Sequence, residues 1–314
     1  MEPKVLCVVG PTACGKTRMG VGLARRFCGE VVSVDSMQIY RGMTIGSAAP
    51  TAEEMEGVPH HMVGVADPHE SWSVARFAEE ADRCVQNILT RGRLPVLVGG
   101  TGLYLDAVIT GRKFAPGASG GAVRRELERE LEEGGIEPLL ARLREVDPQA
   151  AERLHPADTK RILRALEVYR ETGKTISRHN AETAALPRRY APLYIGLAFR
   201  EREDMRIMID HRVDRMMESG LLNEVRALRD AGVPPTATAF QAIGYKELLP
   251  VLDGEAELPA AVEEIKLRSR QYAKRQLTWL RRNPDIRWIN WEKERDFVSA
   301  LQIATEILIA QGLQ

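Results

Sequence analysis

The sequence predicts an α/β fold, with a parallel-sheet core that is interrupted by a helical insertion domain. In the first third of the chain, short apolar runs alternate with stretches of helical periodicity, which is typical of parallel strands joined through helices. A glycine-rich stretch at 111–122 ends this pattern and is read as a linker, and 123–171 is highly charged with helical spacing. The length of 314 residues fits one large domain or two.

Each element is predicted from its local pattern. Helices are expected at about 15–27 and at 73–90, the second with Ser73 as a candidate N-cap. Residues 172–192 are predicted to be a loop, and the chain after the insertion is predicted to be mostly helical. Apolar runs predict strands at 5–9, 31–34, 94–98, 193–199 and 286–289.

These elements divide the chain into a core, 1–113 with 189–314, and a helical insertion, 114–188. The alternative is one domain in which the charged helices pack directly on the core. Hydrophobic residues make up 44% and charged residues 28%, which excludes a wholly disordered chain.

Composition also limits the partners. Lys plus Arg and Asp plus Glu both number 44, so a globally basic nucleic-acid binder is excluded while a local basic face is not. No apolar run approaches the ~20 residues of a membrane span, and the run 5–9 is too short for a signal-peptide core. The four cysteines show no zinc-ligand spacing. We therefore expect a reduced, cytoplasmic protein without a membrane partner.

One segment fits the pattern G-x-x-x-x-G-K-[ST] between a predicted strand and a predicted helix, and it reads Gly10-Pro11-Thr12-Ala13-Cys14-Gly15-Lys16-Thr17. Backbone N–H groups, a helix N-terminus and the Lys16 ammonium together attract phosphate oxygens. The Thr17 hydroxyl is suited to ligating Mg²⁺, which is the expected cofactor. The core is therefore predicted to be P-loop NTPase-like; the alternative is a glycine-rich turn without a ligand.

The predicted strand 94–98 ends in Gly99-Gly100-Thr101-Gly102, with no carboxylate. A nucleotide hydrolase usually holds its Mg²⁺ with an acid at such a place, so the sequence disfavours an ATPase or GTPase. Small-molecule kinases and enzymes that hold a diphosphate for other chemistry remain. Thr101 is a natural N-cap for the helical run 103–109, a role that does not exclude contact with a substrate.

Asp35 ends the second predicted strand, which we expect to lie beside the first. Because ligands of open α/β sheets bind at the carboxyl ends of strands, Asp35 should face the same crevice as the phosphate loop. Its carboxylate can take a proton from a nucleophile or bind Mg²⁺. The alternative is that Asp35 caps a helix that begins at Ser36.

Arg212 falls in the middle of an apolar helical face formed by Met205, Met208, Ile209, Val213 and Met216. A buried arginine needs an anionic partner, which here is either a core carboxylate or a bound phosphate. His60 and His61 suggest a metal pair, but adjacent side chains point apart, so a structural role is expected.

The stretch 266–282 carries seven basic residues and no acid. Within it, Arg268, Tyr272, Arg275, Trp279 and Arg282 have the spacing of one helical stripe, which suits RNA phosphates and unstacked bases. The alternative is a solvated basic helix whose two aromatic rings pack into the core.

Several motifs follow one another in a specific order along the chain. They are Gly10–Thr17, Asp35-Ser36-Met37-Gln38-Ile39-Tyr40, Val58-Pro59-His60-His61, Gly99–Tyr104, Asp158–Glu167, Gln241–Glu247 and Gln271–Trp279. This ordered set resembles the tRNA dimethylallyltransferase (tRNA isopentenyltransferase) family in its bacterial form, over about residues 4–290. Leu280 stands where the family often has an aromatic residue, and the C-terminal zinc finger of some eukaryotic relatives is absent.

The resemblance implies transfer of a dimethylallyl group from dimethylallyl diphosphate to N6 of the adenosine immediately 3′ of the anticodon, tRNA position 37. The products are N6-isopentenyladenosine and diphosphate. Gly10–Thr17 would hold the donor's diphosphate with Mg²⁺, and Asp35 would be the general base. The implied catalytic set also includes Lys16, Arg212 and Thr101. Thr101 would help to place the adenine. The insertion would clamp the anticodon arm, and a monomer is expected.

The residues implied to contact tRNA lie in both parts of the chain. Lys160, Arg161 and Arg164 cluster early in a helix that Asp158 is placed to cap, and salt-bridged surface charge is the alternative there. The full implied set is Asp35, Ser36, Met37, Gln38, Thr101, Arg124, Thr159, Lys160, Arg161, Ile162, Leu163, Gln241, Arg268, Tyr272, Arg275, Trp279 and Arg282.

Two other functions compete. A small-molecule kinase would use the same loop for ATP and Asp35 as the base for a hydroxyl, but it leaves the basic-aromatic stripe unexplained. An RNA-binding protein with a vestigial phosphate loop leaves Asp35 and Thr101 unexplained, and the complete loop argues against it.

Overall fold

The computed structural model describes residues 2–112, 114–115 and 121–314. Residues 113 and 116–120 of the predicted linker 111–122 lie outside the described residues. The chain divides into two compact units, Met1–Gly111 with Arg188–Gln314, and Arg112–Pro187. No helix in the described ranges is long and apolar enough to cross a membrane.

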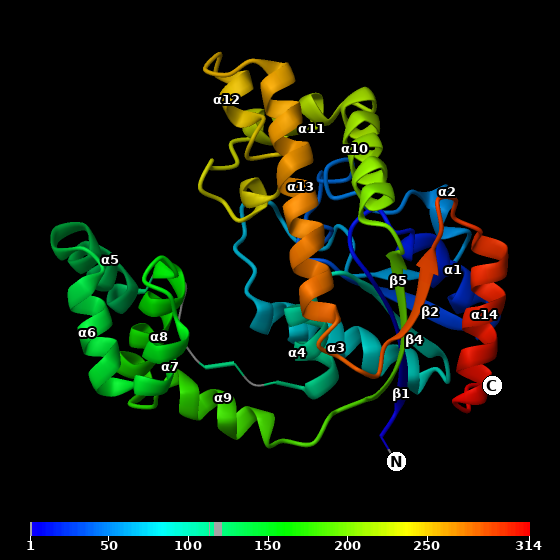
Figure 1. Cartoon of the computed structure of the whole chain (residues 1–314), viewed down its shortest axis with the longest axis horizontal. Helices are drawn as coiled ribbons and strands as arrows, with labels where there is room; N and C mark the ends of the chain where they lie inside the picture. Colours follow the sequence, from blue (N-terminus) through cyan, green and yellow to red (C-terminus); the bar gives the residue numbers. More distant parts are fainter. Residues whose placement is uncertain (1, 113, 116–120) are drawn as a thin grey trace. The chain divides into compact units, whose positions relative to one another are not determined.

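The first unit is built on a six-stranded sheet whose strand pairs are all parallel, which confirms the predicted P-loop NTPase-like α/β fold (Figure 1). All five predicted strands are present. The sheet order is β3-β2-β4-β1-β5-β6. The strands are β1 (Lys4–Val9), β2 (Gly29–Val34), β3 (His60–His61), β4 (Leu94–Gly99), β5 (Ala191–Phe199) and β6 (Arg287–Trp291).

The expectation that the second strand lies beside the first is wrong, because β4 lies between β2 and β1. Val96 of β4 is in register with Leu6 on one side and with Val31 on the other. The β4 run is apolar and almost wholly buried, so pairing on both edges satisfies its backbone groups without exposing it. Asp35 therefore leaves the sheet two strands away from the phosphate loop.

Helices cover both faces of the sheet. On one face, α1 (Lys16–Arg26) and α14 (Phe297–Ala310) pack together over a core that includes Leu6 and Val8. On the other, α3 (Val74–Thr90) contacts β2 and β4 and packs on α4 (Gly102–Thr110). Ser73 caps α3 as predicted, accepting a hydrogen bond from the Arg76 amide at 3.2 Å.

The rest of the first unit is mostly helical, as expected. The long helix α13 (Leu258–Leu280) packs against α10 (Arg202–Glu218), which also contacts α11 (Leu221–Asp230) (Figure 1). Shorter elements are α2 (Ala52–Met55), η1 (Ala239–Gln241) and α12 (Leu249–Leu252).

The second unit is helical and has its own hydrophobic core, in which Leu127, Leu143 and Leu166 are buried. The prediction of a loop over 172–192 is wrong, because α9 and the start of β5 lie within it. Thr175 and Asp147 stabilise the start of α9 by accepting hydrogen bonds from its first amides. The helices are α5 (Ala122–Gly134), α6 (Glu137–Val146), α7 (Pro148–Arg153), α8 (Thr159–Thr172) and α9 (Ile176–Ala184).

The adjacent histidines of β3 have structural partners. The His61 ring lies 2.8 Å from Glu30, and the His60 ring lies 2.8 Å from the Val58 carbonyl oxygen. No group of three metal-ligating side chains occurs among the residues the structure describes. Arg91 also binds the buried Glu30, and mainly for that reason the pKa of Glu30 falls from 4.5 to about 2.

Replacing Glu30 by glutamine should lower the free energy of unfolding by about 2 kcal/mol at neutral pH, since the arginine partners are partly exposed and screened. A depressed carboxyl pKa contributes stability above the unfolded value, and that stability is lost as the pH falls toward the folded value. The difference in the free energy of unfolding between wild type and Glu30→Gln should therefore become smaller as the pH falls from 4.5 to 2. Urea unfolding across this range measures it, and a constant difference would contradict the assignment.

Candidate active site

The phosphate loop leaves β1 at Gly10 and enters α1 at Lys16. Gly15 adopts a left-handed conformation with φ 87°, and a Cβ there would come within 2.5 Å of the Phe297 ring. Glycine is therefore required at Gly15 both for the backbone turn and for the approach of α14. The Lys16 ammonium donates to the Pro11 carbonyl oxygen at 2.7 Å, so it folds back over its own loop.

Residues distant in sequence hold the loop from outside. The Gln276 side-chain oxygen accepts from the Thr12 amide at 2.9 Å. The Trp291 indole donates to the Cys14 carbonyl oxygen at 2.8 Å, and the Arg295 guanidinium donates to the Ala13 carbonyl oxygen at 3.2 Å. These bonds fix the shape of the loop before any ligand arrives.

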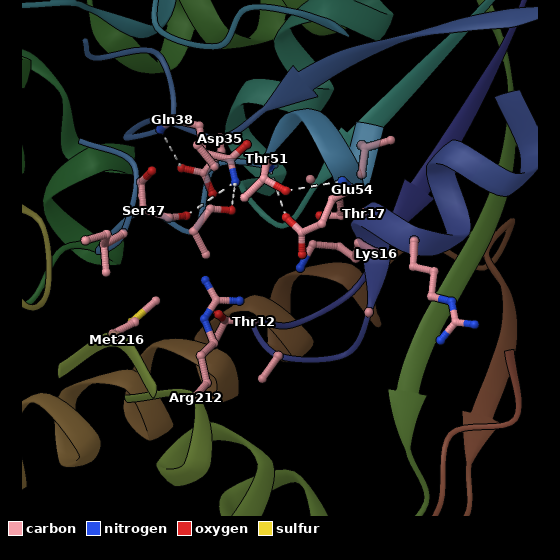
Figure 2. Close-up of a pocket in the computed structure, with 18 of the residues that line it drawn as sticks. Thr12, Lys16, Thr17, Asp35, Gln38, Ser47, Thr51, Glu54, Arg212 and Met216 are labelled. Atoms are coloured by element: carbon pink, nitrogen blue, oxygen red, sulfur yellow. Dashed lines mark hydrogen bonds between the residues drawn. The ribbon is translucent and has the colours of Figure 1, made fainter. Parts of the chain in front are cut away.

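A cavity of about 650 Å³ opens beside the loop at the carboxyl ends of the strands. It brings together residues that the sequence analysis selected separately (Figure 2). Arg212 points from α10 across the cavity toward Asp35 and Lys16. The predicted residues on its wall are Thr12, Ala13, Gly15, Lys16, Thr17, Asp35, Gln38, Arg212 and Tyr272.

The cavity is electrostatically suited to an anion. Burial lowers the pKa of both Lys16 and Arg212. The positive charge of Arg212 lowers the pKa of Lys16 further, and that of Arg215 lowers the pKa of Arg212 further. Asp35 is the carboxylate whose charge favours both cations, but neither forms an ion pair within the described chain. The alternative of a salt bridge from Arg212 to a core carboxylate is therefore not what the structure shows. A bound phosphate would supply the missing negative charge.

Of the two carboxylate oxygens of Asp35, one accepts hydrogen bonds from the backbone and the other is available to a ligand. Its Oδ1 accepts from the Met37 amide at 2.8 Å and from the Gln38 amide at 3.4 Å. The suggested capping of a helix at Ser36 is wrong, because the segment forms a turn and the next helix is α2. In the described ranges no hydrogen bond reaches Oδ2, which leaves it able to accept a proton or a ligand.

Thr101 is not on the cavity wall, where Tyr272 stands instead. It occupies the predicted N-cap position of α4, but its side chain makes no capping hydrogen bond. The Thr101 hydroxyl is buried without a partner of regular geometry and adjoins the Tyr272 hydroxyl. An unsatisfied buried hydroxyl beside a cavity is a candidate contact for a polar ligand.

The predicted basic-aromatic stripe lies along α13 up to Trp279, but Arg282 lies beyond the helix, which ends at Leu280. Arg275 stacks on the Tyr272 ring at 5.8 Å and Arg282 on the Trp279 ring at 5.7 Å. In the described chain neither arginine has a carboxylate partner, whereas Arg268 is paired with Glu264 at 2.6 Å. The stripe thus has an open end, formed by Arg275 and Arg282 with their aromatic rings, and a neutralised end at Arg268.

Trp279 is 39% exposed and lies against Gly102, where a Cβ would come within 2.0 Å of the indole. Its Nε1 donates to Asp106 at 3.2 Å. The alternative that both aromatic rings of the stripe are buried in the core is therefore wrong for Trp279. Gln241, another predicted contact, is exposed at the end of η1.

In the second unit the predicted contacts fall into two groups. Ile162 and Leu163 are 0% and 2% exposed in its core, so their side chains are not available to RNA, and a contact of this segment with tRNA stays a prediction. Asp158 does not cap α8 but pairs with Arg161 at 3.1 Å. Thr159 and Lys160 stand at the start of α8, and Arg124 pairs with Glu128 at 2.8 Å.

Gln276, Trp291 and Arg295 were not selected from the sequence. Gln276 could have been selected as a site residue, because it follows Tyr272 by four residues within the basic stretch and so lies on the same face of the predicted helix. Its side chain also lies where a Cβ on Gly100 would come within 2.3 Å, so a glycine at Gly100 is required for the contact. No local pattern marks Trp291 or Arg295.

A strand, a glycine-rich loop and a helix beginning Lys-Thr, at the carboxyl edge of a parallel sheet, define a phosphate-binding enzyme core of the P-loop class. The IPP transferase family model matches residues 38–283, and an isopentenyl transferase model matches residues 3–63. The chain belongs to the IPP transferase family, the family of the tRNA dimethylallyltransferases.

Individual relatives support this. The chain is 46% identical to tRNA dimethylallyltransferase 1 of Pelobacter propionicus, over 93% of this chain and 94% of that protein. The full-length tRNA isopentenylpyrophosphate transferase of Bacillus halodurans superimposes with a TM-score of 0.72 at 41% identity, over 100% of this chain and 97% of that one. A eukaryotic dimethylallyltransferase acting on tRNA superimposes with a TM-score of 0.83 at 30% identity, over 98% of this chain and 80% of that one.

Proposed function

We propose that this protein transfers a dimethylallyl group from dimethylallyl diphosphate to N6 of adenosine 37 of tRNA, the adenosine immediately 3′ of the anticodon. The observation that carries the proposal is the single cavity in which Lys16 and Arg212, both without a carboxylate partner in the described chain, face Asp35. Such a cavity combines an anion-binding half with a proton acceptor, as transfer from a diphosphate requires.

The anion-binding half holds the diphosphate of the donor. The amides of Gly10–Thr17, the Lys16 ammonium and the Arg212 guanidinium surround the leaving group and stabilise the charge that develops as the carbon–oxygen bond breaks. No acid stands at the end of β4 to hold a nucleotide's metal, which supports a diphosphate over a hydrolysed nucleotide.

The residues present fit Mg²⁺. Thr17 lines the cavity and offers a hydroxyl oxygen, and Mg²⁺ commonly takes one or two protein oxygens together with phosphate oxygens and waters. When bound, Mg²⁺ supplies positive charge to the leaving diphosphate. Thr17 is the protein ligand that we assign to it.

Adenine N6 is a poor nucleophile because its lone pair is delocalised into the ring. As N6 bonds to the allylic carbon, the bond from that carbon to the diphosphate oxygen breaks and N6 loses a proton. Oδ2 of Asp35 accepts this proton. Tyr272 lies near Asp35 and adjoins Thr101, and the hydroxyl groups of these two residues would orient the adenine.

The acceptor RNA binds over the open end of the stripe, where Arg275 and Arg282 stack on aromatic rings. The second unit adds contacts to the anticodon arm through the start of α8, around Thr159 and Lys160. All of these residues belong to one chain, so a monomer suffices. Free cysteines, two of them buried, fit a reducing cytoplasm.

The test is incubation with Mg²⁺, dimethylallyl diphosphate and an anticodon stem-loop with adenosine 3′ of the anticodon. One five-carbon unit should be added to the RNA without ATP, and guanosine at that position should abolish the addition because it lacks the N6 amine. If no mass is added but label from the γ-phosphate of ATP moves to a small acceptor, the protein is a kinase instead.

Replacing both Arg275 and Arg282 by alanine should weaken tRNA binding and flatten its salt dependence. For each RNA phosphate that the protein no longer neutralises, the log–log slope should fall by about 0.7–0.9. Donor affinity should not change, because neither arginine lines the donor cavity. Arg200→Ala, which removes a surface arginine paired with Glu292 at 3.0 Å, is the matched control. A slope equal to that of wild type in the double variant would leave the stripe as solvated charge.

A further inference from the structure

One wall of the cavity is a loop, residues 44–49, that lies outside the phosphate-binding half. Ile45, Ala48 and Ala49 line the cavity from this loop, and Met216 lines it from α10. Ser47 and Met216 are seen on the same side of the cavity in Figure 2, away from Thr17. The loop therefore provides apolar side chains to a wall of the cavity that lies apart from the phosphate loop.

A single carboxylate on α11 holds this loop. Oε2 of Glu224 accepts hydrogen bonds of 2.8 Å from the Thr44 amide, the Thr44 hydroxyl and the Ile45 amide. Oε1 accepts from the Gly46 amide at 3.1 Å and from the Tyr245 hydroxyl. Three consecutive backbone amides thus bind one side chain that is about 180 residues away in sequence.

The loop is also fixed from two other directions. The Gln38 side-chain amide donates to the Ser47 and Ala48 carbonyl oxygens at 3.3 and 2.9 Å, which ties the loop to the turn that follows β2. The Tyr245 ring lies so close to Gly46 that a Cβ on that glycine would come within 2.3 Å of it. Glu224 and Tyr245 therefore hold the part of the loop from Thr44 to Gly46, whereas Gln38 holds Ser47 and Ala48.

We propose that Glu224, supported by Tyr245, is a positioning residue that sets the apolar wall against which the donor's prenyl chain packs. The inference rests on the proposed function and deepens it, because it assigns recognition of the hydrocarbon to the wall 44–49. Attraction between apolar atoms weakens over a fraction of an ångström, so a loop that moves outward binds the five-carbon chain less well. It also leaves room for a longer chain.

The experiment compares two ligands in calorimetric titrations of the whole protein with Mg²⁺. Dimethylallyl thiolodiphosphate, which does not react, reports both halves of the cavity, whereas inorganic diphosphate reports the phosphate half alone. Glu224→Gln keeps the shape of the side chain but turns an amide group toward an N–H donor. It should weaken binding of the prenyl ligand about tenfold and leave that of inorganic diphosphate unchanged.

Further variants sharpen the result. Tyr245→Phe removes one of the five hydrogen bonds that Glu224 accepts, so it should also weaken binding of the prenyl ligand, but by less than Glu224→Gln does. Geranyl thiolodiphosphate, which carries ten carbons, should bind relatively better to Glu224→Gln than to wild type. Asp230→Asn is the matched control, an acid-to-amide change on the same helix at a carboxylate that is 60% exposed.

The inference is overturned if Glu224→Gln binds both ligands as wild type does. It is also overturned if the two affinities fall equally, since the carboxylate would then support the fold and not the prenyl wall. The proposed function fails separately, in the wild-type protein, if dimethylallyl thiolodiphosphate binds no more tightly than inorganic diphosphate.

Discussion

Lys16→Ala should reduce prenyl transfer by at least about 10³-fold, measured as the single-turnover rate with dimethylallyl diphosphate and the stem-loop RNA. Lys16 is the cation that folds over the phosphate loop, 2.7 Å from the Pro11 carbonyl oxygen. Without it the departing diphosphate loses its main charge partner. Arg212 and the loop amides remain, so some donor binding should persist.

Lys293→Ala is the control for this variant, since Lys293 is exposed and lies outside the cavity. The tRNA affinity of Lys16→Ala should equal that of wild type, because Lys16 belongs to the donor half of the site. Transfer at wild-type rate by Lys16→Ala would remove the phosphate loop from the mechanism. Loss of tRNA binding together with activity would instead indicate a damaged fold.

Asp35→Asn should lower kcat by about 10²–10⁴, the range for loss of a general base. Asparagine keeps an oxygen at the Oδ1 position, so the turn through the Met37 and Gln38 amides is retained. The variant lacks only the proton acceptor at Oδ2. Quench-flow measurement at saturating tRNA and donor isolates this step from binding.

Affinities for tRNA and for the non-reactive donor analogue should change little in Asp35→Asn. If donor affinity alone falls, and does so in a Mg²⁺-dependent way, Asp35 is a metal ligand and the assignment as base is wrong. Asp230→Asn again provides the acid-to-amide control on the surface of the same unit.

Much of the core could be predicted from the sequence alone. The buried strands β1, β2 and β4 are short apolar runs that end at glycine or aspartate, and such runs are visible without knowing their neighbours. The phosphate loop is equally local, because eight consecutive residues carry its amides, its lysine and its hydroxyl. Asp35 followed from the rule that strand ends meet at one edge of the sheet.

Helix caps were less predictable. Thr101 and Asp158 both occupy N-cap positions without capping through their side chains. The Thr101 hydroxyl instead lies beside Tyr272, and Asp158 forms an ion pair with Arg161. A residue type allows a cap, but competing partners decide whether it forms.

Tertiary structure alone decided the order of the strands, the burial of Ile162 and Leu163, and the supports of the cavity. The bond from the Thr12 amide to Gln276 spans 264 residues, and the bond from Trp291 to the Cys14 carbonyl oxygen spans 277. Periodicity and motif spacing report only neighbours along the chain. The sequence alone therefore determined five of the six strands of the sheet, the phosphate loop and the candidate base, whereas packing between distant segments determined what holds them in one cavity.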